Sequence, residues 1–281
     1  MRFRTLPIYV GLILTLSYCL TQAGEAQDIE NHPGATHPLT TLSNFNEITT
    51  GWQQCTGSCA GGTNPSATFQ DFHITNPSLD DQAMELGLTG PVSCQSPCNT
   101  GPNNGWYYDT GAADSNTTFE LIFWFYAPSN TDVVSREFDQ FQYLLAGDGG
   151  ATKNTRLYWG TQCVTGGHWD VWNSYSGSWV DTGKTCSYGL GVWNKLDIKV
   201  HRVSGDTSCS GGYPCMYYDY AKLTPHGGST TTIFSNEKTS AGALPAGWGE
   251  QTGFMIQLDG TPTCLSSCTI TEYIDEGSFT Y

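Results

Sequence analysis

Positive charge is scarce in this sequence. Eleven lysines and arginines stand against 26 aspartates and glutamates, which gives a formal net charge of −15. A surface of this kind repels phosphate backbones, so we expect no nucleic-acid partner. Anionic membranes and polyuronates are disfavoured for the same reason. A neutral ligand suits this composition better.

Helical periodicity and catalytic signatures are also lacking. No stretch longer than about ten residues repeats its apolar positions at helical spacing. No repeat of 20–50 residues is present, which excludes solenoids and propellers built from such repeats. The Gly-x-Ser-x-Gly nucleophile elbow and the His-Glu-x-x-His zinc motif are both absent. These absences direct attention to β-structure and to carboxylate chemistry.

The longest apolar run, LPIYVGLILTLSYCL, lies at the N-terminus after two arginines. It is too short to span a membrane comfortably, and small residues follow it, which is typical of a secretory signal peptide. We interpret residues 1–23 as that peptide, with cleavage after Ala23 or, alternatively, Ala26. Lipid attachment at Cys19 is a further alternative. The protein is expected to be secreted or periplasmic, without membrane insertion after cleavage and with a net charge near −17.

Polar residues with two His-Pro steps follow at 24–43, and we expect a disordered leader there. The remaining residues, 44–281, are expected to form one domain. About 240 residues of this kind fit one large sandwich.

Ten of the eleven cysteines remain after cleavage, an even number that fits an oxidising compartment. Four close pairs enclose loops rich in Gly, Pro or Ser, and two further cysteines are left as a fifth pair. The predicted disulfides are Cys55–Cys59, Cys94–Cys98, Cys163–Cys186, Cys209–Cys215 and Cys264–Cys268. Zinc binding by the Cys-x3-Cys pairs is the competing interpretation.

Short apolar alternations separated by Gly, Asn, Asp, Ser and Pro clusters predict an all-β chain. In residues 119–126 the odd positions would line one face and the even positions the other, with aromatic residues on both. Both faces are then at least partly covered, as in a central strand of a sandwich. The segment HWDVWNSYSGSWVDTG predicts a hairpin with its turn near Ser176 and Gly177.

Five segments occur in order between residues 136 and 281: REFDQFQ, YWGTQC, HWDVWNSYSGSWVDTG, VWNKLDIKVHRV and QLDG…YIDEGSFTY. In these segments the chain resembles the concanavalin A-like lectin/glucanase superfamily, and within it an uncharacterised group of exported bacterial proteins. The resemblance implies a two-sheet antiparallel jelly-roll sandwich with disulfide-stapled loops. It also implies a concave sheet that holds a glycan chain, although fold alone does not imply activity.

The chain is distantly similar to family 16 glycoside hydrolases, whose Glu-x-Asp-x-(x)-Glu motif places a nucleophile, a tuning Asp and an acid/base on one strand. Glu137 and Asp139 match the first two positions, and Phe141 and Gln142 stand where the third carboxylate would be. Residues two apart on a strand share a face and lie ~6.6–7 Å apart along it. An amide cannot donate the catalytic proton, so retaining hydrolysis needs an acid from another strand.

Several carboxylates could supply that acid, with nothing in the sequence to choose among them: Glu120, Asp170, Glu250, Asp259, Glu272, Asp275 and Glu276. A lyase would instead need a base and a cation, for which Arg136, Tyr158 and His168 could serve. An acidic protein is a poor host for uronates, which disfavours the lyase.

Glycan binding does not require a catalytic acid. Aromatic rings pack on sugar C–H faces, and carboxyl and amide groups form hydrogen bonds with hydroxyls. The candidate ligand-binding residues are Gln142, Trp124, Gln162, Trp169, Trp172 and Gln257. More than half of the nine tryptophans are expected in the core. The superfamily resemblance also suggests Asp275 as a structural calcium ligand; no other cofactor is expected.

Three functions remain open from the sequence. The first is an exported, monomeric protein that binds neutral polysaccharide on a concave sheet containing Glu137, Asp139 and Gln142. The second is a glycoside hydrolase with Glu137 as the catalytic carboxylate. The third is a structural or adhesion protein of the envelope with no glycan site. Whether the chain is an enzyme is not decided at this level.

Overall fold

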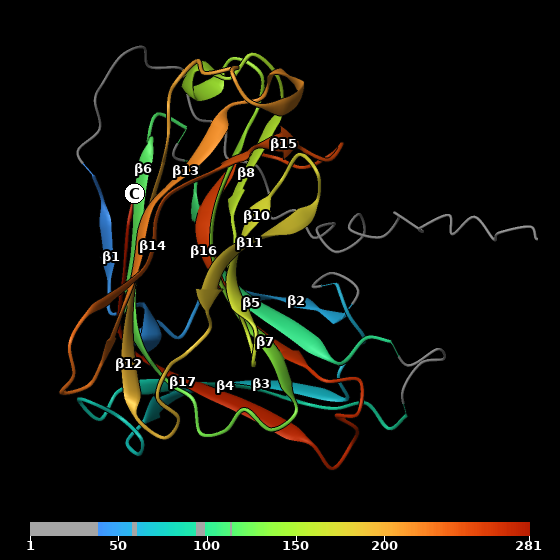
Figure 1. Ribbon diagram of the computed structural model, residues 1–281, viewed down its shortest axis with the longest axis vertical. Helices are drawn as coiled ribbons and strands as arrows, with labels where there is room; N and C mark the ends of the chain where they lie inside the picture. Colours follow the sequence, from blue (N-terminus) through green and yellow to red (C-terminus); the bar gives the residue numbers. More distant parts are fainter. Residues whose placement is uncertain (1–38, 58–60, 94–98, 113) are drawn as a thin grey trace, which may run out of the picture.

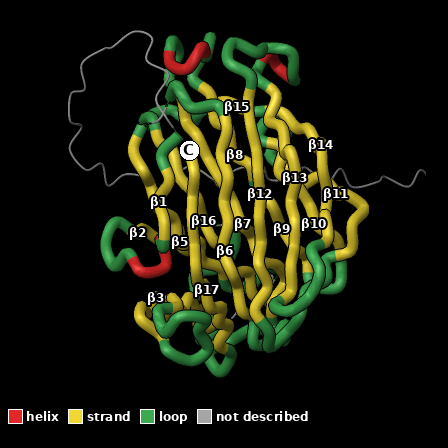
Figure 2. Tube along the Cα trace, turned by 90° about the vertical axis from the view of Figure 1, so that its left-hand side faces the viewer, coloured by secondary structure: helices red, strands yellow, loops and turns green. Residues whose placement is uncertain are grey.

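The computed structural model describes residues 39–57, 61–93, 99–112 and 114–281. In these residues the chain forms two antiparallel β-sheets that pack face to face (Figure 1). Figure 2 shows the long strands of both layers running side by side along the molecule. This arrangement confirms the expected all-β sandwich. The expected signal peptide, residues 1–23, lies outside the described residues.

One sheet has eight strands in the order β14-β13-β12-β6-β17-β4-β3, with β1 paired to β17. Its strands are β1 (Thr41–Ser43), β3 (Ala67–Ile74), β4 (Ala83–Thr89), β6 (Thr118–Tyr126), β12 (Trp193–Arg202), β13 (Cys215–Pro225), β14 (Thr231–Ser240) and β17 (Thr269–Thr280). Its central strands β12, β6, β17 and β4 are neighbours in space but far apart in sequence, as in a jelly roll.

The other sheet has nine strands in the order β11-β10-β9-β7-β16-β5-β2, with β8 joining β7 to β15. Its strands are β2 (Trp52–Thr56), β5 (Asn103–Gly111), β7 (Val133–Leu144), β8 (Thr155–Trp159), β9 (Thr161–Val164), β10 (His168–Asn173), β11 (Ser178–Thr185), β15 (Gly242–Ala243) and β16 (Gln251–Gly260). The helical segments among the described residues are three short 3-10 turns, η1 (Phe45–Glu47), η3 (Asp148–Gly150) and η4 (Ser210–Gly212).

The core lies between the sheets and follows the period of two that the sequence predicts. In β6 the odd positions Phe119, Leu121, Phe123 and Phe125 are buried, while the even positions are partly exposed. In β12 the side chains of Leu196, Ile198 and Val200 are fully buried. From the opposite layer, the ring of Phe138 on β7 packs between Phe123 and Phe125. The burial of these rings holds the two sheets together.

An ion pair also crosses between the sheets. Arg136 on β7 donates to the carboxylate of Glu272 on β17, and both side chains are buried. The remaining guanidinium donors reach Asn130, Tyr188 and the carbonyl of Ser129. Burial raises the pKa of Glu272, and the charge of Arg136 partly offsets that rise. This network is internal to the sandwich, so Arg136 cannot serve a ligand.

The expected hairpin is confirmed as β10 and β11, whose strands pair from His168↔Thr185 to Asn173↔Ser178. Gly177 in the turn has a φ of 62°, a conformation that glycine adopts without strain. Three of the expected disulfides are present: Cys163–Cys186, Cys209–Cys215 and Cys264–Cys268. The pairs Cys55–Cys59 and Cys94–Cys98 involve positions outside the described residues. Disulfides of this kind are consistent with an oxidising, extracytoplasmic compartment.

The end of the expected leader, residues 41–43, is ordered into a strand. Thr41–Ser43 was expected to end the leader but forms β1, paired with Ser278–Thr280 of β17. The pairing gives the backbone of these residues the hydrogen bonds that a disordered leader would lack. Among the described residues, no helix is long and apolar enough to cross a membrane.

Candidate functional site

A cavity of about 440 Å³ lies on the outward face of the nine-stranded sheet. Alternation along β7 decides which of its residues reach this cavity. Ser135, Glu137, Phe141 and Tyr143 line it, together with Val134 near the start of the strand, whereas Arg136, Phe138, Gln140 and Gln142 are buried. Glu137 therefore opens onto a cavity, as the pleat of the strand predicts.

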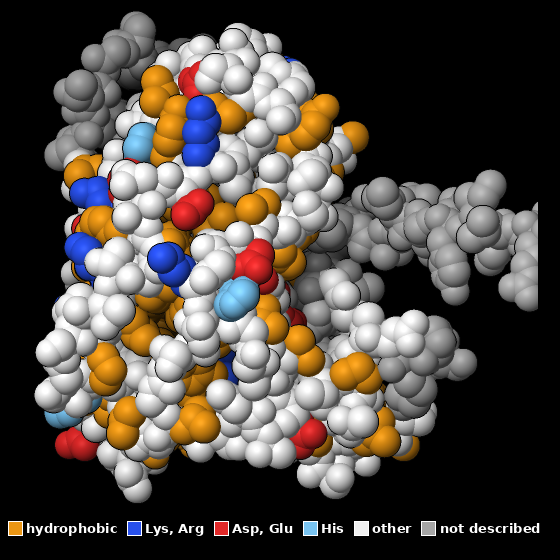
Figure 3. Space-filling view, in the orientation of Figure 1, with side chains coloured by type: hydrophobic (Ala, Val, Ile, Leu, Met, Phe, Trp, Pro, Cys, Tyr) orange, Lys and Arg blue, Asp and Glu red, His pale blue; other side chains and the backbone are white. Residues whose placement is uncertain are grey.

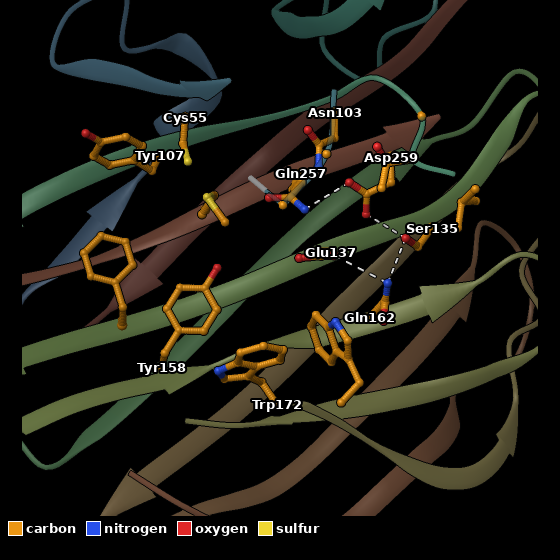
Figure 4. A pocket seen from close by; sticks show the side chains of 18 of the residues that line it. Cys55, Asn103, Tyr107, Ser135, Glu137, Tyr158, Gln162, Trp172, Gln257 and Asp259 are labelled. Atoms are coloured by element: carbon orange, nitrogen blue, oxygen red, sulfur yellow. Dashed lines mark hydrogen bonds between the residues drawn. The ribbon is translucent and has the colours of Figure 1, made fainter. Parts of the chain in front are cut away.

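The neighbouring strand β16 brings a second carboxylate beside Glu137. In the antiparallel register Gln257 lies opposite Glu137, and Asp259 lies opposite Ser135. The Ser135 hydroxyl donates to Asp259 Oδ2 at 2.6 Å, and Gln257 Nε2 donates to Asp259 Oδ1 at 3.0 Å. The carboxyl groups of Glu137 and Asp259 share a hydrogen bond. Figure 4 shows this polar group gathered around the end of the cavity.

An amide from β9 completes the group. Gln162 Nε2 donates to Ser135 Oγ at 2.8 Å and to Glu137 Oε1 at 3.4 Å. Gln162 and Gln257 thus lie on either side of Glu137 in the sheet, because β9 and β16 flank β7. The sequence identified both amides as ligand-binding candidates. The structure brings both to the cavity wall.

Burial and mutual repulsion set the charge of the carboxyl pair. Burial is the main reason that the pKa of Glu137 lies well above its usual range, and the nearby charges of Asp259 and Asp139 raise it further. Burial also raises the pKa of Asp259, although hydrogen bonds from the surrounding side chains oppose that rise. Two carboxyl groups that share a hydrogen bond hold one proton between them most easily. The pair therefore carries less than its formal charge of two near neutral pH.

Asp139 shares the face of Glu137 but lies behind the cavity wall. Its side chain is fully buried, and it accepts hydrogen bonds from Tyr158 Oη at 2.7 Å and from the Thr161 backbone N–H at 3.2 Å. Burial raises the pKa of Asp139 to about 8, although the bonds from Tyr158 and Thr161 lower it. Tyr158 itself lines the cavity, so Asp139 acts on the site by orienting that phenol.

Aromatic rings form much of the remaining wall. Trp172 and Trp179, from the two strands of the β10–β11 hairpin, meet at a ring-centroid distance of 5.1 Å and an interplanar angle of 70°. Gly160 lets this pair approach the strand behind it, since a Cβ there would lie 2.9 Å from both Trp172 and Trp179. Farther along the cavity, the rings of Tyr143 and Trp248 lie 5.3 Å apart.

Three of the predicted ligand-binding residues lie elsewhere. Gln142 is fully buried between the sheets, where its amide oxygen accepts from Arg202 Nε at 2.6 Å and its Nε2 donates to the Asn116 carbonyl. Trp169 is 1% exposed and belongs to the core. Trp124 lies on the outer face of the other sheet, against His226. Gln142 lies five residues from Glu137 and Trp169 lies three from Trp172, and an odd separation along a strand reverses the face.

Asp275, the suggested calcium ligand, lies on β17. It is fully buried, and its oxygens accept hydrogen bonds from Asn46 Nδ2, Ser78 Oγ and the backbone N–H groups of Leu79 and Glu276. No group of three or more potential metal ligands occurs among the described side chains. The contacts of Asp275 tie β17 to the loop before β4, and its suggested role as a calcium ligand stays a prediction.

Among the candidate partner acids, Asp259 alone lines the cavity with Glu137. The residues suggested for a lyase also lie far apart: Arg136 is in the core, His168 pairs with Asp181 on the exposed hairpin, and Tyr158 is at the cavity.

Sequence reasoning missed several lining residues, namely Tyr107, Tyr143, Arg156, Trp248 and Gln251. For Tyr143 the signal was available, since it stands six residues from Glu137 on the same strand.

No protein-family model and no curated protein sequence matches this chain. Among solved structures, a PL-14 alginate lyase from Aplysia kurodai has a TM-score of 0.54 at 11% identity, covering 85% of this chain and 97% of the lyase. This likeness concerns the β-sandwich fold alone. Arcelin-5, a lectin-like defence protein from Phaseolus vulgaris, matches with a TM-score of 0.44 at 12% identity over 86% of this chain and 97% of arcelin.

A family 11 carbohydrate-binding module from Clostridium thermocellum has a TM-score of 0.38 at 9% identity, covering 86% of this chain and 94% of the module. At these identities the likeness concerns the fold alone. The distant similarity to family 16 glycoside hydrolases stays a prediction.

Proposed function

We propose that this protein is exported and binds a neutral polysaccharide, as a monomer, in the cavity on the nine-stranded sheet. The observation that carries the proposal is the composition of one wall: indole rings of Trp172 and Trp179 beside the hydrogen-bonding groups of Glu137, Gln162 and Gln257. Rings of this kind pack on the apolar faces of sugars, and the amides and carboxyls bond their hydroxyls.

The electrostatics of the site support a neutral sugar ring at the carboxyl pair. Burial raises the pKa values of Glu137, Asp139 and Asp259, so protons neutralise part of the charge that would repel or attract ions. A partly protonated carboxyl pair both donates to and accepts from hydroxyl groups. On the face shown in Figure 3, charged side chains of both signs lie scattered among uncharged atoms.

Glycoside hydrolysis is the second candidate, because Asp259 supplies the acid that the β7 motif lacks. The geometry favours it less than binding. Retaining hydrolysis uses carboxyl groups ~5–5.5 Å apart and inverting hydrolysis ~6.5–9.5 Å, so that a sugar carbon or a water fits between them. Glu137 and Asp259 instead share a hydrogen bond. Both also project from the same sheet, on one side of any bound ring.

A glycan array followed by affinity electrophoresis on soluble β-glucans, xylans and mannans tests the proposal. Wild type is expected to be retarded by at least one neutral polysaccharide, and Glu137→Gln is expected to weaken that retardation without releasing reducing sugar in either protein. Trp124→Ala, on the other sheet, is the matched control. Absence of retardation by every neutral glycan would contradict binding. Release of reducing sugar by wild type, lost in both Glu137→Gln and Asp259→Asn, would establish hydrolysis instead.

A further inference from the structure

The cavity has two chemically different ends. Glu137 lies opposite Gln162 and Gln257 at the carboxyl end, whereas Tyr143, six residues later on β7, lies opposite Arg156 on β8 and Gln251 on β16. At a rise of ~3.3 Å per residue the two ends are about 20 Å apart along the strand. Figure 4 shows the polar group at one end and Tyr107 at the other. A bound chain would thus contact both environments at once.

Among the described residues that line the cavity, one carries a positively charged side chain, and that residue is Arg156. Its Nη2 donates to the Ser174 carbonyl at a long 3.4 Å, and its buried Nε has no hydrogen-bond partner. The salt bridges found among the described residues do not include it. A buried guanidinium donor without an acceptor is costly, which makes this one unusual.

The other arginines in the described part of the chain are satisfied. Arg136 has Glu272, Asn130, Tyr188 and a backbone carbonyl, and Arg202 has Gln142 and the carbonyls of Asp114 and Gly149. The sequence has more than twice as many acidic as basic residues, so an ion partner for Arg156 would have been easy to provide. Its side chain instead lines a cavity.

The side chain directly opposite Arg156 in the sheet does not offset its charge. Tyr143, which lies opposite Arg156 in the sheet, is a phenol whose pKa burial raises, so it stays neutral. A guanidinium presents its donors in a planar fork that matches a carboxylate, and such charge-assisted bonds are about twice as strong as neutral ones.

We propose that Arg156 binds a carboxylate on the glycan, so that the ligand is a largely neutral chain bearing an acidic sugar or substituent at the Tyr143 end of the cavity. This inference rests on the proposed function. It reconciles the acidic protein with an anionic group: one carboxylate in contact with Arg156 gains a short-range bond, while repulsion from distant carboxylates is screened beyond ~8–10 Å at physiological salt. A polyuronate, charged on every ring, would place a carboxylate against Glu137 and Asp259 as well.

The test compares matched ligands. An array would carry neutral glucan, xylan and mannan oligosaccharides, the same types bearing uronic acid or pyruvate groups, and the acidic members after chemical reduction of their carboxyl groups to alcohols. Wild type is expected to bind at least one acidic member about ten- to hundredfold more tightly than its reduced form, the range for hydrogen bonds to charged groups. That preference should weaken as salt is raised.

Variants at Arg156 separate this inference from the proposed function. Arg156→Gln is expected to abolish the preference while still binding the neutral backbone, and Arg156→Lys to keep part of it, because the charge remains without the fork. Lys199→Gln, which removes one positive charge from the outer face of the other sheet, controls for net charge and should change nothing. Circular dichroism would check that each variant is folded.

Equal binding of acidic and reduced members by wild type would overturn the inference and leave the proposed function intact. The same holds if Arg156→Gln keeps the preference. Failure to bind any member of the array would overturn both. Preference for uniformly charged polyuronates over sparsely charged chains would also contradict the inference, since it predicts repulsion at Glu137 and Asp259.

Discussion

The hydroxyl of Ser135 donates a 2.6 Å hydrogen bond to Asp259 Oδ2, and this contact joins strands β7 and β16 at the carboxyl end of the cavity. The two residues lie directly opposite each other in the antiparallel register. Because Glu137 follows two residues after Ser135 on the same face, the contact also holds Asp259 beside Glu137. A residue 122 positions away thus supplies the second carboxyl group that the local β7 motif lacks.

The carboxyl group of Asp139 should make stability depend on pH. Its pKa is raised from 3.8 to about 8 by burial, so the folded state holds this proton more tightly than the unfolded state does. Its contribution to stability is therefore fully present below about pH 4 and is lost progressively as the pH rises through 8. Urea denaturation of wild type and Asp139→Asn between pH 4 and 9 measures this. The stability of the variant should fall less steeply over that interval, and parallel curves would contradict the assignment.

Trp172 and Trp124 should respond differently to truncation although both are partly exposed. Trp172 lines the cavity, so Trp172→Ala is expected to weaken glycan binding at least about tenfold, or ~1.4 kcal/mol. Trp124 packs on His226 at the outer face of the other sheet, and Trp124→Ala should leave binding unchanged. Titration calorimetry with the tightest array ligand makes the comparison. Equal losses in both variants would place the ligand outside this cavity.

Substitutions of Gln142 and Gln162 should affect fold stability and glycan affinity in opposite ways. Gln142→Ala removes the acceptor of Arg202 Nε inside the sandwich and is expected to destabilise the fold by roughly 2–3 kcal/mol, because a buried charged donor loses its partner. The glycan affinity of the folded variant should be unaffected. Gln162→Ala, at the cavity wall, should do the reverse and weaken binding with a smaller loss of stability. Chemical denaturation and calorimetry on the same samples decide whether the two effects separate in this way.

Removing one partner of the Arg136–Glu272 pair should lower the free energy of unfolding more than replacing both partners with apolar residues. Removing one partner leaves a buried charge between the sheets, so Arg136→Met and Glu272→Leu are each expected to cost about 3–5 kcal/mol. The double variant should be more stable than either single variant, since no unpaired charge remains. A double-mutant cycle by denaturation tests this. Additive losses would show that the two side chains do not interact, contrary to the structure.

Local alternation of apolar and polar residues predicts much of the sandwich. The apolar positions of β6 and β12 repeat every second residue, and the pleat of a strand turns that repeat into one buried face. The same rule places Glu137 and Asp139 together. The same alternation predicts that Gln142 lies on the opposite face from Glu137, because the two residues are five positions apart, which is an odd number. The hydrolase motif, rather than the alternation, suggested Gln142 as a ligand residue.

Alternation along the sequence does not predict which distant strands pair or in which register. Seven carboxylates were equal candidates for the partner of Glu137, because the choice depends on which strand lies beside β7 and in which alignment. Pairing β16 with β7 settles it in favour of Asp259. Likewise, only the packing of the two sheets shows that Arg136 is enclosed by the sandwich, whereas Arg156 faces the cavity.

The residue pattern alone establishes an all-β chain and the facing of side chains within each strand, since both follow from a local period of two. The three-dimensional fold decides which strands become neighbours, and hence the partner of Glu137, the burial of Asp139 and the exposure of Arg156 to the cavity. Those features arise from contacts between residues far apart in sequence, whose alignment is set by the packing of the whole core.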